Sequence, residues 1–121
     1  MPIRKILIVD DSKTELHHLS SLLGKAGYKV RTAENGDEAL ASLAADKPDL
    51  ILMDIVMPGA NGFQLTRQIT RDPRWSDVPV VICTSKNQET DRVWGMRQGA
   101  RDYIVKPVVA DELYAKIKAF D

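Results

Sequence analysis

Five residues of the sequence carry groups suited to metal or phosphoryl chemistry, and each ends or follows a short apolar run. The set comprises three carboxylates, a hydroxyl and an ammonium, contributed by Asp10, Asp11, Asp54, Thr84 and Lys106. Three carboxylates that lie together repel one another, because each disfavours the charged form of its neighbours. Such a cluster therefore calls for a cation, and the candidates are Lys106 and a bound divalent metal ion.

A site made of oxygen ligands suits Mg²⁺ or Mn²⁺ better than zinc. A carboxylate can also act as a nucleophile and form an aspartyl phosphate. Asp54 stands alone opposite the pair Asp10 and Asp11, so we expect Asp54 to be the nucleophile and the pair to bind the metal. Lys106 would then neutralise charge on the transferring oxygens, and Thr84 would donate a hydrogen bond to one of them.

A simpler interpretation stays open for each residue taken alone. Asp10 and Asp11 could merely cap a following helix, and Asp54 could merely begin a turn. Lys106 precedes Pro107, which forces the lysine into an extended conformation and admits a cis peptide bond. A cis bond would point the amine into the crevice, whereas Lys106 is otherwise a solvated lysine at a strand end.

The elements that must position these residues alternate between strand and helix along the whole chain. Apolar runs predict strands at 6–9, 29–33, 50–53, 78–83 and 103–105. Continuous apolar runs fit strands with helices on both faces, whereas the alternating run 29–33 fits an edge strand. The sequence therefore predicts an α/β fold, a flavodoxin-like doubly wound five-stranded parallel sheet in the order 2-1-3-4-5 with five helices. The turn-rich segment 57–62 is expected to form a loop.

Composition excludes several classes of protein. The chain has 121 residues with 17 Lys and Arg against 17 Asp and Glu, which argues against a general nucleic-acid binder. No apolar run is long enough to span a bilayer, and the first residues do not resemble a signal peptide. One cysteine, Cys83, excludes an internal disulfide. We expect a single cytoplasmic domain over 1–121, with no output domain, no nucleic-acid partner and no membrane insertion.

Four segments together resemble the response-regulator receiver domain, in order and at the spacing of that family. They are Ile8–Ser12, Met53–Pro58, Cys83–Ser85 and Tyr103–Pro107, and the resemblance covers the whole chain. It implies that Asp54 accepts a phosphoryl group from a histidine kinase. It also implies a signalling domain rather than an enzyme, because a receiver catalyses only its own phosphorylation and dephosphorylation.

The same resemblance assigns the remaining roles at the site. The implied Mg²⁺ ligands are Asp10, Asp11, Asp54 and the backbone carbonyl of Val56. Thr84 and Tyr103 are implied as a switch pair, in which the hydroxyl moves toward the phosphoryl group and the aromatic ring turns inward.

Segments 57–64 and 88–95 resemble a narrower group, the chemotaxis-like regulators of type IV pilus twitching motility. This implies a histidine kinase of the chemotaxis type and an output protein that docks on the fourth helix, the fifth strand and the fifth helix. Two other functions stay open: a phosphate sink that drains a shared kinase, and a small Mg²⁺-dependent phosphohydrolase.

Residues at the rim of the expected site suggest further roles. Val56 lies two residues after Asp54 and cannot orient an attacking water, and Lys86 lies two residues after Thr84, so both are expected to tune the lifetime of the aspartyl phosphate. The residues expected on the partner surface are Arg92, Met96, Tyr103 and Lys116. Ordinary loop residues and a solvated helix face are the alternatives.

Overall fold

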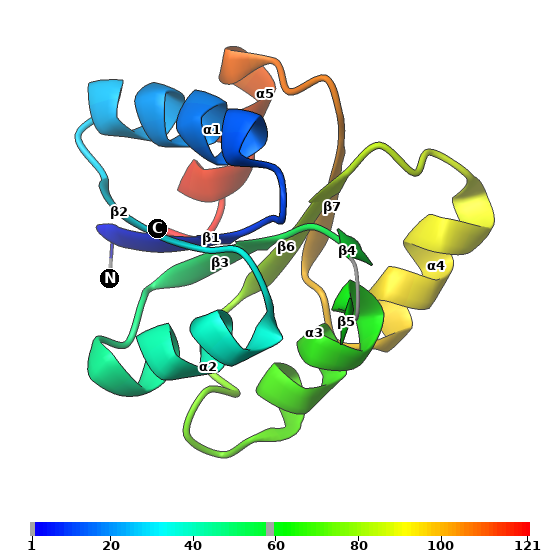
Figure 1. Ribbon diagram of the computed structural model, residues 1–121. Helices are drawn as coiled ribbons and strands as arrows, with labels where there is room; N and C mark the ends of the chain where they lie inside the picture. Colours follow the sequence, from blue (N-terminus) through cyan, green and yellow to red (C-terminus); the bar gives the residue numbers. More distant parts are fainter. Residues whose placement is uncertain (1, 58–59) are drawn as a thin grey trace.

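Five parallel strands form one sheet in the order β2-β1-β3-β6-β7. The computed structural model describes residues 2–57 and 60–121 (Figure 1). The strands of this sheet are β1 (Lys5–Val9), β2 (Lys29–Ala33), β3 (Leu50–Met53), β6 (Val80–Thr84) and β7 (Asp102–Val105). Counted within the sheet, the order is 2-1-3-4-5, so the predicted doubly wound fold is confirmed. The absence of an output domain stays a prediction.

Helices cover both faces of the sheet. They are α1 (Lys13–Lys25), α2 (Gly36–Ala45), α3 (Gly62–Arg71), α4 (Glu89–Arg97) and α5 (Ala110–Lys118). Helices α1 and α5 lie on one face, and α2 and α3 lie on the other (Figure 1). Leu19 and Ile117 belong to the core on the first face, whereas Leu43 and Ile69 belong to the core on the second.

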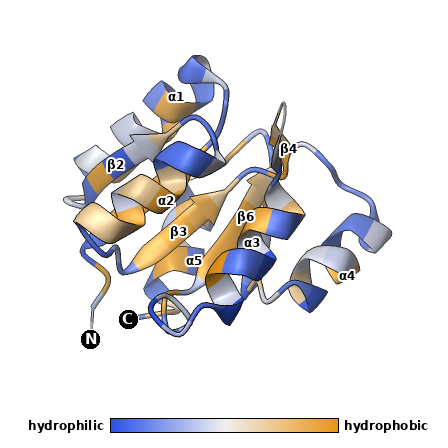
Figure 2. Cartoon of the chain, turned by 60° about the horizontal axis from the view of Figure 1, so that its bottom comes forward, coloured by the Kyte–Doolittle hydropathy of each residue, from blue (hydrophilic) through white to orange (hydrophobic). Residues whose placement is uncertain are grey.

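The burial of each strand explains its sequence. All four residues of β3 are buried, and Figure 2 shows β3 and β6 in hydrophobic colours between the helices. Strand β2 lies at the sheet edge, and Ala33 is its buried residue. A strand with helices on both faces needs apolar residues at successive positions, whereas an edge strand tolerates polar ones. The expected edge position of 29–33 is therefore correct.

Two details differ from the sequence-based expectation. The segment expected to be a loop contains a two-stranded antiparallel pair, β4 (Val56–Met57) and β5 (Ala60–Asn61). Residues 58 and 59 of that segment lie outside the described residues. The fourth strand of the main sheet begins at Val80 rather than Val78, since the amide of Val78 donates to the carbonyl of Trp75 at 2.9 Å.

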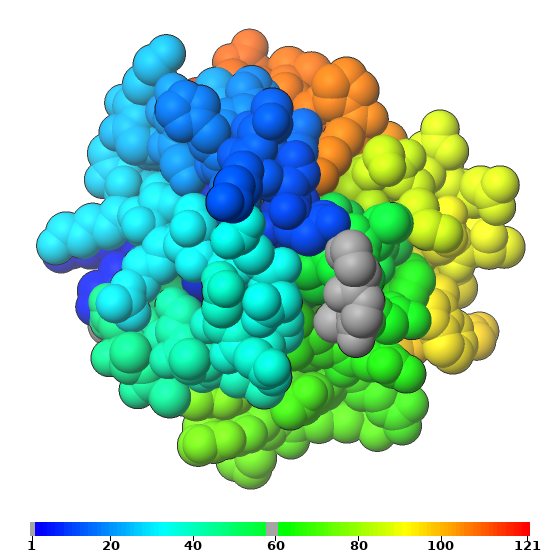
Figure 3. All heavy atoms as spheres, viewed as in Figure 1, coloured from blue at the N-terminus to red at the C-terminus, as the bar shows by residue number. Residues whose placement is uncertain are grey.

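Helix α4 packs against the sheet through a glycine. A Cβ on Gly95 would lie 2.5 Å from Ile82 Cδ1, so the helix approaches the sheet closely at this point. Its large side chains Val93, Trp94 and Met96 are exposed instead. In Figure 3 the residues of α4, in yellow, protrude at one side of the molecule. None of the helices in the described part of the chain has both the length and the apolar character needed to cross a membrane.

The first residue of α3 is a glycine because the backbone after β3 passes directly over it. A Cβ on Gly62 would collide with the carbonyl oxygen of Asp54 and the Cα of Ile55, both backbone atoms that no rotamer change can move. We expect Gly62→Ala to lower the free energy of unfolding by about 3 kcal/mol, at the upper end of the usual range for overpacking.

The matched control is Gly24→Ala in α1, because a Cβ at Gly24 meets nothing within 4 Å. The free energy of unfolding of that variant should rise by about 1 kcal/mol, because alanine has a better helix propensity than glycine. Urea unfolding of both variants measures the two changes. Equal stabilities for Gly62→Ala and the wild type would show that the backbone after β3 is not held against α3.

Candidate functional site

The predicted site residues lie at the carboxyl ends of strands of the main sheet. Asp10, Asp54 and Lys106 each follow a strand directly, and their amides continue the backbone hydrogen bonding of the sheet. The amide of Asp10 donates to Ala33 at 3.0 Å, that of Asp54 to Val9 at 2.9 Å, and that of Lys106 to Thr84 at 2.8 Å. The sheet thus holds the backbone of each of these three residues in place. Strands β1 and β3 are neighbours where the strand order reverses, which is where ligands bind in such sheets.

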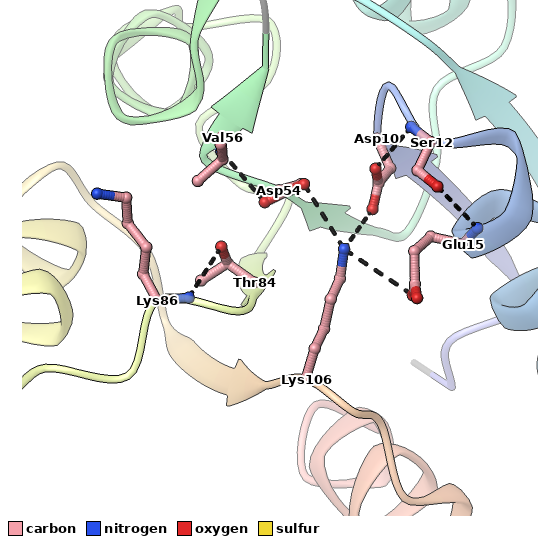
Figure 4. Close-up of polar contacts among 8 residues, drawn as sticks. All are labelled: Asp10, Ser12, Glu15, Asp54, Val56, Thr84, Lys86 and Lys106. Atoms are coloured by element: carbon pink, nitrogen blue, oxygen red, sulfur yellow. Dashed lines mark hydrogen bonds and ion pairs between the residues drawn. The ribbon is translucent and has the colours of Figure 1, made fainter.

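The ammonium of Lys106 lies among carboxylates from three different elements (Figure 4). Its Nζ donates to Asp10 Oδ2 at 2.7 Å, and it lies 3.6 Å from Asp54 Oδ2 and 3.9 Å from Glu15 Oε2. Burial alone would lower the pKa of Lys106, but the hydrogen bond to Asp10 and the charges of Asp54 and Asp10 outweigh burial and raise it. Lys106 is therefore held as a cation.

The Lys106–Pro107 peptide bond is cis, the isomer that the sequence admits at this position. The amine points toward the carboxylates rather than into solvent (Figure 4). The interpretation of Lys106 as a solvated lysine at a strand end is therefore wrong.

Asp54 is a buried carboxyl with incomplete charge compensation. The residue is 7% exposed, and Oδ1 accepts a hydrogen bond from the amide of Val56 at 3.2 Å. Burial raises the pKa of Asp54, and the charge of Asp10 raises it further, against the opposing effects of the Val56 amide and Lys106. The ionised carboxylate would therefore gain from a further cation nearby.

Asp10, Asp11 and Asp54 form a group that fits a divalent ion. A carboxylate oxygen from each lies within 4.8 Å of the others, and Asp11 is exposed whereas the other two are buried. A donor set of carboxylate oxygens matches Mg²⁺ or Mn²⁺. The carbonyl of Val56 as an additional ligand stays a prediction. Receiver domains bind Mg²⁺ at an acidic pocket of this kind.

Thr84 and Tyr103 lie close to the β6–α4 loop. Thr84 is fully buried, and its Oγ1 accepts a hydrogen bond from the amide of Lys86 at 3.5 Å. The hydroxyl of Tyr103 donates to the carbonyl of Lys86 at 2.8 Å. Tyr103 is 4% exposed, so its ring already points inward in this structure. One short segment thus contacts both members of the expected switch pair.

The predicted partner surface requires a correction. Arg92 and Met96 are exposed on α4, but Tyr103 is buried beneath that helix and offers no exposed ring. A Cβ on Gly95 would lie 3.6 Å from Tyr103 Cε2, which shows how closely α4 covers the ring. Lys116 is half-buried and pairs with Asp102 at 3.0 Å. The four residues therefore do not form one exposed surface.

Glu15 faces Lys106 from the first turn of α1, a contact that the sequence did not predict. The pattern Ser12-Lys13-Thr14-Glu15 has the form of a helix capping box, in which the glutamate only serves the helix end. A glutamate in that position therefore predicts a helix cap and does not indicate a functional site. The sequence also did not predict that position 62 must be a glycine. That requirement arises because the backbone of Asp54 and Ile55 passes close to Gly62.

We expect Asp54→Asn to raise the free energy of unfolding at pH 7 in buffer without divalent ions. The raised pKa of Asp54 means that the folded state favours the protonated carboxyl. The stability of the wild type therefore falls as the pH rises from the unfolded-state pKa through the higher folded-state pKa. The increase in the free energy of unfolding of Asp54→Asn over the wild type should be full at pH 7 and vanish in acid. Urea unfolding at several pH values measures this difference. A variant no more stable than the wild type at pH 7 contradicts this account.

Comparison with known proteins agrees with this geometry. Residues 6–118 match the family described as the response regulator receiver domain. The chain is 56% identical over 115 residues to the protein PilH of Pseudomonas aeruginosa, a match that covers 95% of each chain. It is 40% identical over 116 residues to the phosphate regulon transcriptional regulatory protein PhoB of the same organism, which covers 96% of this chain and 51% of PhoB.

A solved structure gives the same result at the level of the fold. The Vibrio cholerae chemotaxis protein CheY4 superposes with a TM-score of 0.92 at 29% sequence identity, covering 98% of this chain and 99% of that one. The chain therefore belongs to the response-regulator receiver domain family.

Proposed function

We propose that this protein accepts a phosphoryl group on Asp54 from a histidine kinase of the chemotaxis type and then changes its binding to an output protein. The observation that carries this proposal is the position of Asp54, a buried carboxyl 3.6 Å from the ammonium of Lys106 and within one acidic group with Asp10 and Asp11. The pathway we propose is chemotaxis-like control of type IV pilus twitching motility. It rests on the motifs at 57–64 and 88–95 and on the identity to PilH.

The chemistry follows from the groups at the site. A carboxylate oxygen of Asp54 attacks the phosphorus of a phosphohistidine, the new O–P bond forms, and the P–N bond breaks as the histidine leaves. A Mg²⁺ ion held by Asp10, Asp11 and Asp54 would offset negative charge on the phosphoryl oxygens. Lys106 supplies a second cation 3.6 Å from Asp54 Oδ2, and Thr84 supplies a hydroxyl donor.

Signal output would depend on the segment between β6 and α4. Thr84 accepts from the amide of Lys86, and Tyr103 donates to the carbonyl of the same residue. A phosphoryl group on Asp54 that recruits the Thr84 hydroxyl would weaken the first of these bonds and shift the loop. Such a change biases an equilibrium between two arrangements of α4 and the loop.

The output partner would dock on α4 and the adjoining end of β7. Met96 is exposed on α4 and Val105 at the end of β7, and the exposed arginines Arg92 and Arg97 belong to the same helix as Met96. An arginine-rich face on a protein of zero net charge favours an acidic partner surface. Because a histidine kinase takes its phosphoryl group from ATP, we place this exchange in the cytoplasm.

Incubation with Mg²⁺ and acetyl phosphate tests the phosphoacceptor. We expect a single phosphoryl adduct on the intact protein by mass spectrometry, and its complete loss in Asp54→Asn, because the amide cannot act as the nucleophile. Asp111→Asn on the exposed first turn of α5 is the control and should leave the adduct unchanged. No adduct on the wild type would contradict the proposal.

The same experiment separates the other two functions. An adduct that decays within minutes favours a phosphate sink, whereas a long-lived adduct favours a signal carrier. Repeated turnover of an unrelated phosphoester without any adduct would instead favour a Mg²⁺-dependent phosphohydrolase.

Val56 and Lys86 should control the lifetime of the aspartyl phosphate. Both residues are exposed and lie on the side of Asp54 away from Asp10 (Figure 4). We expect Val56→Asn to shorten the lifetime several-fold, because an amide at this position can orient an attacking water and the present isopropyl group cannot. Lys86→Glu should change the lifetime as well, by reversing the charge at the rim.

The decay of purified phosphoprotein, followed by intact mass, measures both effects. Lys118→Glu near the end of α5 provides a charge-reversal control at an exposed position. If both rim variants decay at the wild-type rate, Val56 and Lys86 do not control the lifetime of the aspartyl phosphate.

A further inference from the structure

Glu15 brings a fourth carboxylate to the site from a different direction. Its Oε2 lies 3.9 Å from Lys106 Nζ, and its side chain is 32% exposed. Figure 4 shows Glu15 and Asp54 on opposite sides of the ammonium of Lys106. Glu15 is also absent from the group of carboxylates close enough to share a metal ion, which comprises Asp10, Asp11 and Asp54.

Helix capping does not account for the position of this carboxylate. In a complete capping box the glutamate accepts a hydrogen bond from the amide of the residue that caps the helix. Here the amide of Ser12 donates instead to Asp10 Oδ1 at 2.9 Å, although Ser12 Oγ still accepts from the amide of Glu15 at 3.3 Å. Half of the box is therefore formed, and the glutamate carboxylate extends toward Lys106.

Helix α2 offers an internal comparison. Glu38 occupies the same position in α2 as Glu15 does in α1, the third residue of the helix. Its carboxylate folds back onto the helix start, where Oε1 accepts from the amide of Glu34 at 3.0 Å and Oε2 from the side-chain amide of Asn35 at 3.4 Å. The different direction of Glu15 thus reflects the site beside it.

The three contacts of Lys106 differ in how they would respond to a divalent ion. Asp10, which accepts the 2.7 Å hydrogen bond, and Asp54 both belong to the metal-binding group. Both would be drawn to a cation bound there, so Lys106 and the ion compete for the same oxygens. Glu15 remains available to Lys106, because it stands on the opposite side and outside that group.

We propose that Glu15 is a positioning residue, which holds the ammonium of Lys106 beside Asp54 when Asp10 and Asp54 bind Mg²⁺. The inference rests on the proposed function, because it concerns the metal-bound form of the same site. Glu15 acts through Lys106 and does not touch the reacting atoms. By offering Lys106 a replacement partner, it lowers the free-energy cost of releasing Asp10 to the ion.

The test is a double-mutant cycle on Mg²⁺ affinity, measured by isothermal titration calorimetry without any phosphodonor. We expect Glu15→Gln to weaken Mg²⁺ binding about three- to tenfold, as expected for neighbouring charges that are energetically coupled. In the background of Lys106→Met, the same substitution should change the affinity much less, because the residue through which it acts is gone. Glu38→Gln is the matched control and should bind Mg²⁺ as the wild type does.

Two results would overturn the inference. One is an unchanged Mg²⁺ affinity in Glu15→Gln, and the other is an equal loss with and without Lys106, which would mean that Glu15 acts directly on the ion. As a second measurement, the phosphorylation rate at saturating Mg²⁺ should fall in Glu15→Gln and not in Glu38→Gln. A wild type that binds Mg²⁺ but never forms an adduct on Asp54 would contradict the proposed function while leaving the coupling of Glu15 and Lys106 measurable.

Discussion

The mutual repulsion of carboxylates at the end of the sheet is the constraint on which the site depends. Asp10 and Asp54 are both buried, so neither is well screened by water. Lys106 offsets this repulsion with a 2.7 Å hydrogen bond to one carboxylate and a 3.6 Å contact to the other. Removing Lys106 would cost about 3–5 kcal/mol, the usual range for breaking a buried ion pair, because the charge of Asp10 would be left without its partner. One ammonium against several carboxylates leaves an excess of negative charge, which is what makes the site suited to a divalent ion.

The fold supplies the stiffness that keeps these charges together. Asp10 and Asp54 follow β1 and β3, which are paired on both sides, and Lys106 follows β7, which pairs with β6. Backbone hydrogen bonds of 2.8–3.0 Å continue past the strand ends to hold all three residues. Gly62 allows α3 to begin in close contact with the backbone of Asp54, because it has no Cβ.

The sequence predicted the fold and the convergence of Asp10, Asp11, Asp54 and Lys106 because both depend on local patterns. Continuous apolar runs distinguish buried parallel strands, and the residue after each run is placed by the sheet rather than by its own preferences. The burial of Tyr103 was not predictable in this way. It depends on how closely α4 approaches β6 at Gly95, which is a property of packing rather than of either element's own sequence pattern. The contact of Glu15 with Lys106 likewise arises from tertiary structure, whereas the local sequence around Glu15 favours a helix cap. The β4–β5 pair is local, but strands of two residues are too short to show an alternating pattern.

We expect the carboxyl ends of β1 and β3 to form one site for a divalent cation. Titration of isotope-labelled protein with a trace of Mn²⁺ tests it most directly, because the paramagnetic ion broadens nuclear magnetic resonance signals near its binding site. We expect the amide signals of Asp11, Asp54 and Val56 to broaden first and excess Mg²⁺ to restore them. Broadening that begins at other acidic residues, such as Asp111 and Glu112 on α5, or that Mg²⁺ fails to reverse, would show that Asp10, Asp11 and Asp54 do not form the cation site.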